Sequence, residues 1–451
     1  MLNSPSLKIF FSGIGGSGVS AIAGFMADKG HFVAGSDRLF DLSATHPVRQ
    51  RLAENGVVLF PQNGQGIDGS FDLAVFSTSV EQSNPDFRKA ASIEIPLKTR
   101  PEYLADIVQE YKTIAVAGTS GKSTTSGMLA FLMQQLGMAP NFIGGGRVKQ
   151  FRTLQNSGNY LAGSSDTLII EACESDGTIV NYKPAYSIIL NLDLDHHSID
   201  QTARMFEKLS ENTSKGVFVS ADDNNLEACN IRDAIGFSLQ RKSAYQAKDI
   251  IYSPLRTVFK VNGQPYELSL PGEYNLYNAL ACISLLSELG ISAKNIAAVL
   301  PEFSGIERRF DIHRNDGRYL VIDDYAHNPH KMKSLMEAVK KISDKVCYIF
   351  QPHGYGPTRL MKDGYIDTFA KGLRSTDHLV LLPIYYAGGT AAKDISSGDI
   401  LAGIKTAGKS AELIGERLQF FHIPVKWDTY VILGARDDSL SDFAREIAEK
   451  L

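Results

Sequence analysis

The chain has 451 residues, of which 43% are hydrophobic and 21% are charged, and its formal net charge at pH 7 is −4. This length predicts two or three domains, and the charge balance excludes the basic surface that nucleic acid or acidic lipid would require. The four cysteines have no paired spacing, and no apolar run is long enough to span a bilayer. We therefore expect a cytoplasmic protein that acts on small molecules, with no nucleic acid and no membrane as partner.

Short apolar runs alternate with helix-like segments along the chain, in three series. The first contains KIFFSGIGG, HFVAGSD and DLAVFSTS; the second runs from KTIAVAG to a helix at about 275–290; the third includes YLVIDD and TYVILGA. Such alternation is typical of parallel sheets with crossover helices. We predict three α/β domains, over residues 1–110, 111–310 and 311–451.

The first glycine-rich turn, GIGGSG, follows the first predicted strand. Gly13, Gly15 and Gly18, with Asp37 after the next strand, match the fingerprint of dinucleotide-binding domains and hence of a dehydrogenase. The backbone amides of such a turn can hold any diphosphate, so the fingerprint alone does not select NAD. Tight packing of a strand on a helix, without a ligand, is a third interpretation.

A second turn, GTSGKST (residues 118–124), joins the strand KTIAVAG to the amphipathic segment GMLAFLMQQLG. Free loop amides and the positive end of a helix then point at one place, which suits a polyphosphate. Lys122 would neutralise phosphate oxygens, and the Ser123 hydroxyl would complete a magnesium shell. The commonest phosphate loop has a glycine at the position of Val116, and the alternative here is a plain turn with an exposed lysine.

Two further strands of the second series end in polar sequences, EACESD and NLDLDHH. Because ligands gather at the carboxyl ends of parallel strands, we expect Glu174 and His196 to lie beside Ser123. Carboxylate and imidazole groups suit magnesium when phosphates supply the remaining oxygens. Alone, an acidic loop is usually only solvated, and a single histidine is usually structural.

Taken in order, these motifs and the later segments LPGEYNLYNAL, GIERRFD, DDYAHNP and FQPHGY resemble the Mur ligase family. Its ATP-dependent enzymes join amino acids to the UDP-muramyl precursor of peptidoglycan in the bacterial cell wall. The resemblance covers nearly the whole chain. It implies an N-terminal Rossmann-like domain for a UDP-sugar, a central P-loop ATPase with a parallel sheet, and a C-terminal Rossmann-like domain. We expect a monomer or homodimer.

The resemblance also assigns roles to individual residues. It implies that Lys122, Arg309 and His327 are catalytic, with His327 either assisting the amine or only positioning it. Mg2+ would be held by Ser123, Glu174 and His196. The implied ATP contacts are Gly118, Thr119, Ser120, Gly121, Lys122, Ser123, Thr124, Asn275, Asn278, Arg309 and Asp324. The implied substrate contacts are Gly13, Gly15, Gly16, Ser17, Gly18, Asp37, Ser77, Thr78, His353, Tyr355 and Arg359.

The reaction that the resemblance implies is a carboxylate–amine ligation. ATP would phosphorylate a carboxylate on a UDP-N-acetylmuramate-type substrate, and the amine of an amino acid or peptide would attack the acyl phosphate. The pattern is of the L-alanine-adding type, but Gly354 and Pro357 replace two arginines near the incoming amino acid. Because arginine binds carboxylate through two parallel hydrogen bonds, we hypothesise an altered amine specificity, with Arg359 as one substitute. Arg436 stands where the family prefers glycine and is either an acceptor contact or a solvated loop residue.

Two other functions stay open. An NAD-dependent dehydrogenase would explain GIGGSG but would leave GTSGKS without a role. A nucleotide-binding Mur-like regulator without turnover would explain the missing arginines. The retained transfer groups argue against that regulator: Lys122, Ser123, Glu174, His196 and Arg309.

Overall fold

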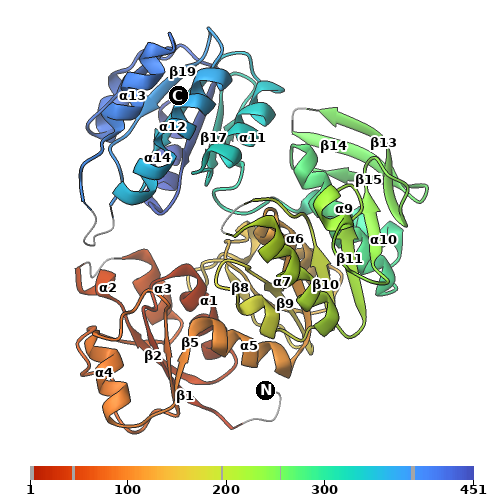
Figure 1. Cartoon of the computed structure of the whole chain (residues 1–451), viewed down its shortest axis with the longest axis vertical. Coiled ribbons are helices and arrows are strands. Elements are labelled where there is room, and N and C mark those ends of the chain that lie inside the picture. The colour runs from red at the N-terminus through yellow and green to blue at the C-terminus, as the bar shows by residue number, and fades with distance from the viewer. Residues whose placement is uncertain (1–4, 43–45, 195–196, 254, 387–391) are drawn as a thin grey trace. The chain divides into compact units, whose positions relative to one another are not determined.

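The structure is a computed structural model, and it describes residues 5–42, 46–194, 197–253, 255–386 and 392–451. It is an α/β protein with three sheets, in agreement with the predicted fold class (Figure 1). Contacts divide the chain into two compact units, Met1–Gly305 and Ile306–Leu451. The first unit holds two of the sheets, and its end lies close to the boundary predicted between residues 310 and 311.

The described strands of the first sheet all pair in parallel, in the order β3-β2-β1-β4-β5. They are β1 (Lys8–Ser12), β2 (Phe32–Ser36), β3 (Val58–Phe60), β4 (Leu73–Phe76) and β5 (Leu97–Thr99). The helices are α1 (Ser17–Asp28), α2 (Arg38–Leu42), α3 (Pro47–Glu54), α4 (Pro85–Ser92) and α5 (Arg100–Glu110). Ile9, Phe10 and Phe11 of the central strand β1 are fully buried, because both faces of the sheet are covered. The GIGGSG turn therefore leaves the middle of the sheet.

The second sheet has the order β15-β14-β13-β12-β11-β10-β6-β9-β7-β8. Its strands are β6 (Lys112–Ala117), β7 (Asn141–Ile143), β8 (Tyr160–Leu161), β9 (Thr167–Glu171), β10 (Tyr186–Ile189), β11 (Gly216–Ser220), β12 (Ile235–Ser238), β13 (Tyr245–Ser253), β14 (Arg256–Val261) and β15 (Gln264–Leu268). The strands predicted at KTIAVAG, DTLIIEA and AYSIILNLD are β6, β9 and β10, and β6 pairs in parallel with both others. Among the described strands of this second sheet, antiparallel pairing is confined to β7–β8 and to the hairpins of β13–β15.

The helices of this sheet are α6 (Lys122–Gln135), α7 (Ile199–Asn212), α8 (Asn224–Glu227), α9 (Glu273–Glu288) and α10 (Ala293–Val299). Helix α9 confirms the helix predicted at about 275–290. Both α6 and α9 are buried on nearly every side, as expected for apolar helices packed in the interior. None of the helices in the described ranges has the length and apolar character needed to cross a membrane.

The second unit contains a sheet in the order β16-β17-β21-β18-β19-β20, shown in cyan to blue in Figure 1. Its strands are β16 (Asp311–Asn315), β17 (Leu320–Asp324), β18 (Val346–Gln351), β19 (His378–Leu381), β20 (Ala411–Leu413) and β21 (Thr429–Gly434). Its helices are α11 (Pro329–Lys340), α12 (Tyr355–Gly372), α13 (Ser397–Thr406) and α14 (Ser439–Lys450). Strand β21 pairs in parallel with β17 and β18, so the loops after these three strands leave the same edge.

Candidate active site

The turn between β6 and α6 has the conformation of a phosphate loop. Gly118 and Gly121 adopt positive φ angles of 138° and 86°, which other residues reach only with strain. A Cβ atom on Gly121 would lie 2.6 Å from Asn278 Oδ1. The loop therefore requires glycine at Gly121 both for its backbone and for the space beside α9.

Asn191, at the end of β10, fixes the middle of this loop. Its Oδ1 accepts hydrogen bonds from the Thr119 hydroxyl and the Ser120 amide, each at 2.8 Å. Its Nδ2 donates to the Ser120 carbonyl at 3.1 Å. The sequence analysis did not name this residue, although its position at a strand end in NLDLD was the signal that could have found it. Asn191 holds the loop open at the point where phosphate would bind.

The ammonium group of Lys122 is buried in the loop. It donates to the Gly118 carbonyl at 2.6 Å and pairs with Glu174 Oε2 at 2.8 Å, and Lys122 is only 9% exposed. Burial lowers the pKa of Lys122, but nearby negative charge, chiefly that of Glu174, outweighs burial and raises the pKa above its ordinary value. The lysine is thus charged, and Glu174 is its counter-ion.

Ser123 lies beside a different carboxylate. Its hydroxyl donates to Glu171 Oε2 at 2.8 Å, and the Gly145 amide donates to the same oxygen at 3.0 Å. Glu171 ends β9 and pairs in register with Val116, two residues before the phosphate loop. Of the two glutamates in EACESD, the structure therefore brings Glu171, which the sequence analysis missed, to the predicted magnesium hydroxyl. Metal binding by Glu174 stays a prediction.

The Ser123 hydroxyl and the Glu171 carboxylate can bind a hard cation such as Mg2+ only if a bound ligand supplies further oxygens. His196 lies outside the described residues, and no cluster of three or more His, Cys, Asp or Glu side chains suited to a metal occurs in the described ranges. One hydroxyl and one carboxylate oxygen are nevertheless what magnesium takes from a protein when phosphate and water complete its shell. The residues present therefore fit Mg2+ bound together with a nucleotide.

The predicted adenine contacts Asn275 and Asn278 lie on α9, beside the phosphate loop. Asn278 Nδ2 donates to Asn275 Oδ1 at 3.2 Å, and Asn275 Nδ2 donates to the Pro271 carbonyl at 2.7 Å. Each asparagine is only 4% exposed. The structure thus brings both residues to the nucleotide loop, while contact with adenine stays a prediction.

The GIGGSG turn is packed for close backbone approach. A Cβ on Gly13 would lie 2.7 Å from Ser77 Cβ, and one on Gly15 would lie 2.9 Å from Asp37 Oδ2. Asp37 accepts from the Gly15 amide at 2.8 Å and from the Leu39 amide at 2.9 Å. One oxygen of Asp37 therefore serves the turn, and the other serves the backbone two residues after Asp37. Gly16 precedes α1, which begins at the predicted contact Ser17 and includes Gly18, and Thr78 is exposed just after β4.

A buried carboxylate that the sequence analysis did not name supports the same turn. Asp86 is completely buried and accepts hydrogen bonds from the hydroxyls of Ser12 and Ser36 and from the Gly64 amide. Ser12 and Ser36 are the last residues of β1 and β2. Asp86 therefore ties together the two strand ends from which the GIGGSG turn and Asp37 emerge.

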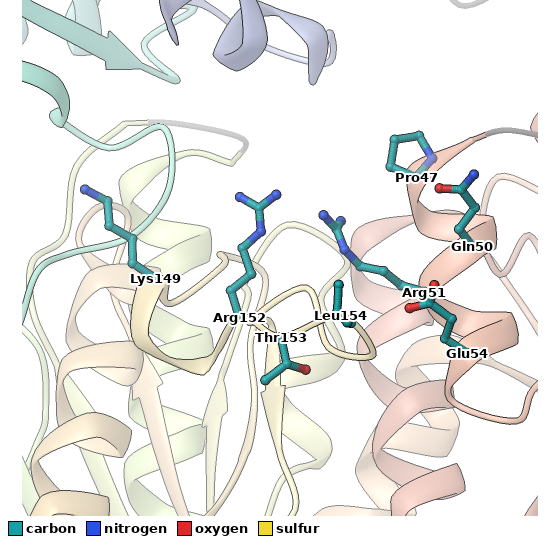
Figure 2. Close-up of a pocket in the computed structure, with 8 residues that line it drawn as sticks. All are labelled: Pro47, Gln50, Arg51, Glu54, Lys149, Arg152, Thr153 and Leu154. Atoms are coloured by element: carbon teal, nitrogen blue, oxygen red, sulfur yellow. The ribbon is translucent and has the colours of Figure 1, made fainter.

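A pocket of about 510 Å³ opens between α3 and the segment around the short helix Lys149–Phe151. Figure 2 shows that the long side chains of Arg51, Lys149 and Arg152 extend toward its open side. The full lining is Pro47, Gln50, Arg51, Glu54, Lys149, Arg152, Thr153 and Leu154. Three cationic side chains against one carboxylate make this pocket suited to an anionic group.

In the second unit, the predicted residues His327 and His353 lie together at the carboxyl edge of the sheet. Their ring centroids are 5.4 Å apart, and His327 Nδ1 is 2.9 Å from the Tyr325 carbonyl. Tyr355 begins α12 and stacks edge-on against Tyr386, with ring centroids 5.1 Å apart. The structure therefore gathers the predicted acceptor-side residues of this unit at one edge.

Three other predicted residues of this unit are differently placed. Asp324 receives the amides of Phe310 and Ala326, each at 2.7 Å, so its carboxylate already organises the backbone. Burial raises the pKa of Asp324. Arg309 is exposed on the segment before β16. Arg359, proposed as a substitute for the missing arginines, is ion-paired with Asp394.

This chain has a phosphate loop with a paired lysine at the end of a central parallel strand, and a second glycine-rich turn at the end of β1. Together these features define a nucleotide-binding α/β enzyme. Three family models match this chain: "Mur ligase family, catalytic domain" over residues 8–112, "Mur ligase middle domain" over 116–286 and "Mur ligase, glutamate ligase domain" over 308–436. The three matched ranges follow one another along the chain without overlap, and the division at residues 110 and 310 stays a prediction.

Similar proteins agree with these models. The UDP-N-acetylmuramate–L-alanine ligase of Fusobacterium nucleatum is 32% identical to this chain, and the match covers 98% of this chain and 97% of the relative. The enzyme of the same name from Persephonella marina is also 32% identical, and that match covers 99% of this chain and 98% of the relative. The crystal structure of the UDP-N-acetylmuramate-alanine ligase of Thermotoga maritima superposes with a TM-score of 0.82 at 28% identity, over 98% of this chain and 99% of its own. The chain therefore belongs to the Mur ligase family.

It is an ATP-dependent Mur-type ligase, as the resemblance of its motifs implied. A murein peptide ligase from Psychrobacter arcticus shares the fold, with a TM-score of 0.71 at 21% identity over 99% of this chain and 98% of its own. The dehydrogenase and the regulator are not favoured by any of these matches. The glycine-rich fingerprint was therefore insufficient to identify an NAD enzyme, because its amides can serve any diphosphate.

Proposed function

We propose that this protein uses ATP to join L-alanine to the carboxylate of UDP-N-acetylmuramate through an acyl phosphate. The observation that carries the proposal is the pair of contacts in the phosphate loop, Lys122 with Glu174 and Ser123 with Glu171. They provide a charged donor for phosphate and an oxygen pair for magnesium in one loop. The similar proteins with these substrates in their names supply the choice of sugar and amine.

The chain's own residues would favour phosphate transfer through electrostatic interactions. The Lys122 ammonium would donate to phosphate oxygens and offset the charge that gathers during transfer. Ser123 and Glu171, together with phosphate and water, would hold magnesium, which would supply Lewis-acid stabilisation of the same charge. Asn191 fixes the conformation of the loop through the Ser120 amide and carbonyl, so little rearrangement of the loop is needed when the nucleotide binds.

Two features of the first unit suit an anionic sugar nucleotide. The GIGGSG turn presents backbone amides at the start of α1, where a diphosphate is stabilised by the helix end. The pocket lined by Arg51, Lys149 and Arg152 offers cationic groups on the same unit. We assign the diphosphate to the turn and a further anionic part of the substrate to this pocket.

Cytoplasmic location and a monomeric or homodimeric state belong to the proposal as well. The substrates named for the similar proteins are a nucleotide-activated sugar and an amino acid. No membrane contact is needed for a reaction between dissolved substrates.

Coupled measurement of ADP and amide formation tests this function. With UDP-N-acetylmuramate, ATP, Mg2+ and L-alanine together, we expect one ADP for each amide, and omission of any one component should stop both. Lys122→Met is the test variant, because it retains the side-chain length but removes the charge. We expect it to lose at least a hundredfold in kcat, about 3 kcal/mol. ADP formation that does not depend on the sugar nucleotide would refute the proposal.

A further inference from the structure

The carboxyl edge of the C-terminal sheet presents three loops side by side. Strand β21 lies between β17 and β18, and the loops after these strands carry Arg436, His327 and His353 respectively. Ligands of open parallel sheets bind at this edge. A ligand that reaches these two histidines therefore also comes near the loop that carries Arg436.

The backbone of Arg436 is strained. Its φ angle is +70°, a left-handed conformation that glycine adopts freely and that costs an L-residue free energy. The Arg436 amide donates to the Tyr325 hydroxyl at 3.4 Å, which ties this loop to the loop that carries His327. Backbone strain of this kind persists where the surroundings fix it and is concentrated at ligand sites. An arginine at this position is retained against a conformational cost.

The guanidinium of Arg436 differs from the other arginines near this edge. Arg308 is buried and donates to the Gly434 and Asp437 carbonyls, Arg417 pairs with Asp437, and Arg359 pairs with Asp394. Arg436 is exposed, and its side chain makes no hydrogen bond or ion pair with the described part of the chain. It is therefore a cation that can be paired by a ligand.

The neighbours of Arg436 leave room for such a ligand. His353 and Arg436 follow the paired strands β18 and β21 at the same edge of the sheet. Burial lowers the pKa of His353, and the positive charge of Arg436 lowers it further. The next residue, Gly354, has φ +66°, and a Cβ there would touch only the ring of Pro357, at 3.2 Å. Among the described residues, only the ring of Pro357 thus lies within 4 Å of a side chain added at Gly354.

We propose that Arg436 binds the α-carboxylate of the incoming free amino acid and so determines the amine specificity of the enzyme. The inference rests on the proposed function and deepens it. The planar guanidinium forms two parallel hydrogen bonds with a carboxylate, and Gly354 and Pro357 have no group that could do so. The acceptor class is accordingly a free α-amino acid, and an amine without an adjacent carboxylate is a poor substrate.

Steady-state kinetics with L-alanine and L-alaninamide tests this assignment at saturating ATP, Mg2+ and UDP-N-acetylmuramate. We expect the natural chain to prefer L-alanine, and Arg436→Gly and Arg436→Gln to raise the KM for L-alanine about tenfold or more while the KM for the amide stays the same. Arg436→Lys keeps the charge without the planar fork and should retain part of the preference. Because Arg436→Gly relieves the backbone strain, it should also raise Tm by roughly 1–3 °C.

Arg445→Gln is the matched control. Arg445 is an arginine of α14 that pairs with Asp442, so its replacement removes one positive charge from the same unit away from the edge, and the preference should persist. Equal losses for both amines, or an unchanged KM for L-alanine in the Arg436 variants, would overturn the role of Arg436. If the natural chain releases no ADP with any amine, the proposed function fails instead, so the two failures are distinguishable.

Discussion

Lys122 and Ser123 each contact a glutamate, and the two glutamates are three residues apart in the same motif. Glu174 is buried against Lys122 and its Oε1 has no hydrogen-bond partner, whereas Glu171 contacts Ser123 and the Gly145 amide. The two carboxylates therefore serve different partners. At the scale of the residue, this division separates the carboxylate that pairs with the lysine from the carboxylate that lies beside the Ser123 hydroxyl.

The first prediction concerns the different partners of Glu171 and Glu174. Glu171→Gln should raise the Mg2+ concentration for half-maximal activity at least about tenfold, which corresponds to ~1.4 kcal/mol, because a metal oxygen loses its charge. Glu174→Gln should leave the Mg2+ requirement close to that of the natural chain and lower Tm, because Lys122 keeps a buried charge without its counter-ion. Magnesium titrations of both variants measure this. A larger Mg2+ shift in Glu174→Gln would show that Glu174 is the metal ligand.

The sequence predicted Lys122 and Ser123 because a phosphate loop is a local pattern that needs only a strand, a turn and a helix. It did not predict Glu171 or Asn191. Glu171 contacts Ser123, which is 48 residues away, and Asn191 contacts two loop residues that are 71 and 72 residues away. These contacts therefore depend on the pairing of β6 with β9 and β10. The sequence shows that a residue follows a strand, but it does not show whether the side chain of that residue points toward a neighbouring loop. Arg359 shows the same limit, because its partner Asp394 is 35 residues away.

At the scale of the element, the phosphate loop depends on the contact between the start of α6 and α9. Gly121 has no room for a Cβ beside Asn278, while Gly137, at the other end of α6, has nothing within 4 Å of such an atom. Both glycines have positive φ angles, of 86° and 76°. The pair thus separates the cost of backbone strain from the cost of the contact.

Gly121→Ala is the second prediction. The variant should lose about 1–3 kcal/mol of unfolding free energy and bind an ATP analogue at least tenfold more weakly, because the added methyl group displaces the loop from Asn278. Gly137→Ala should pay only the cost of strain and keep its affinity for the analogue. Calorimetric titration of both variants provides the measurement, and equal affinities would argue against the loop as the nucleotide site.

The C-terminal sheet has its own electrostatic element, centred on Asp323 of β17. Burial raises the pKa of Asp323 from 3.8 to about 6, although Arg308 lies 3.3 Å away. The folded state therefore binds a proton more readily than the unfolded state between pH 4 and 6. It follows that the contribution of Asp323 to stability is complete below about pH 4 and is lost as the pH rises through 6.

The third prediction follows from the upward shift of the Asp323 pKa on folding. Between pH 4 and 6.5, the unfolding free energy of the natural chain should fall relative to that of Asp323→Asn, by up to about 3 kcal/mol. Denaturant unfolding of the full chain at several pH values measures the difference. Parallel profiles for the two proteins would show that the side chain of Asp323 has the same pKa in the folded and unfolded states.

At the scale of the whole molecule, the chain consists of two units joined at Gly305 and Ile306. Their α/β class was predictable because apolar runs of strand length alternate with helical segments, and each run is buried as expected. The antiparallel extension β13–β15 was not predicted, because β13 is exposed along much of its length and β14 and β15 bury only alternate residues. The predicted nucleotide contacts are divided between the units, with Lys122 in the first and Arg309 and Asp324 in the second.

The central claim is that ATP is consumed to activate a carboxyl group. Synthesis of UDP-N-acetylmuramate with 18O in its carboxylate, followed by one round of ligation with L-alanine, tests this claim most directly. We predict that one labelled oxygen appears in the inorganic phosphate for each amide formed, because the acyl phosphate transfers that oxygen when the amine attacks. Unlabelled phosphate, produced together with the amide, would contradict the account.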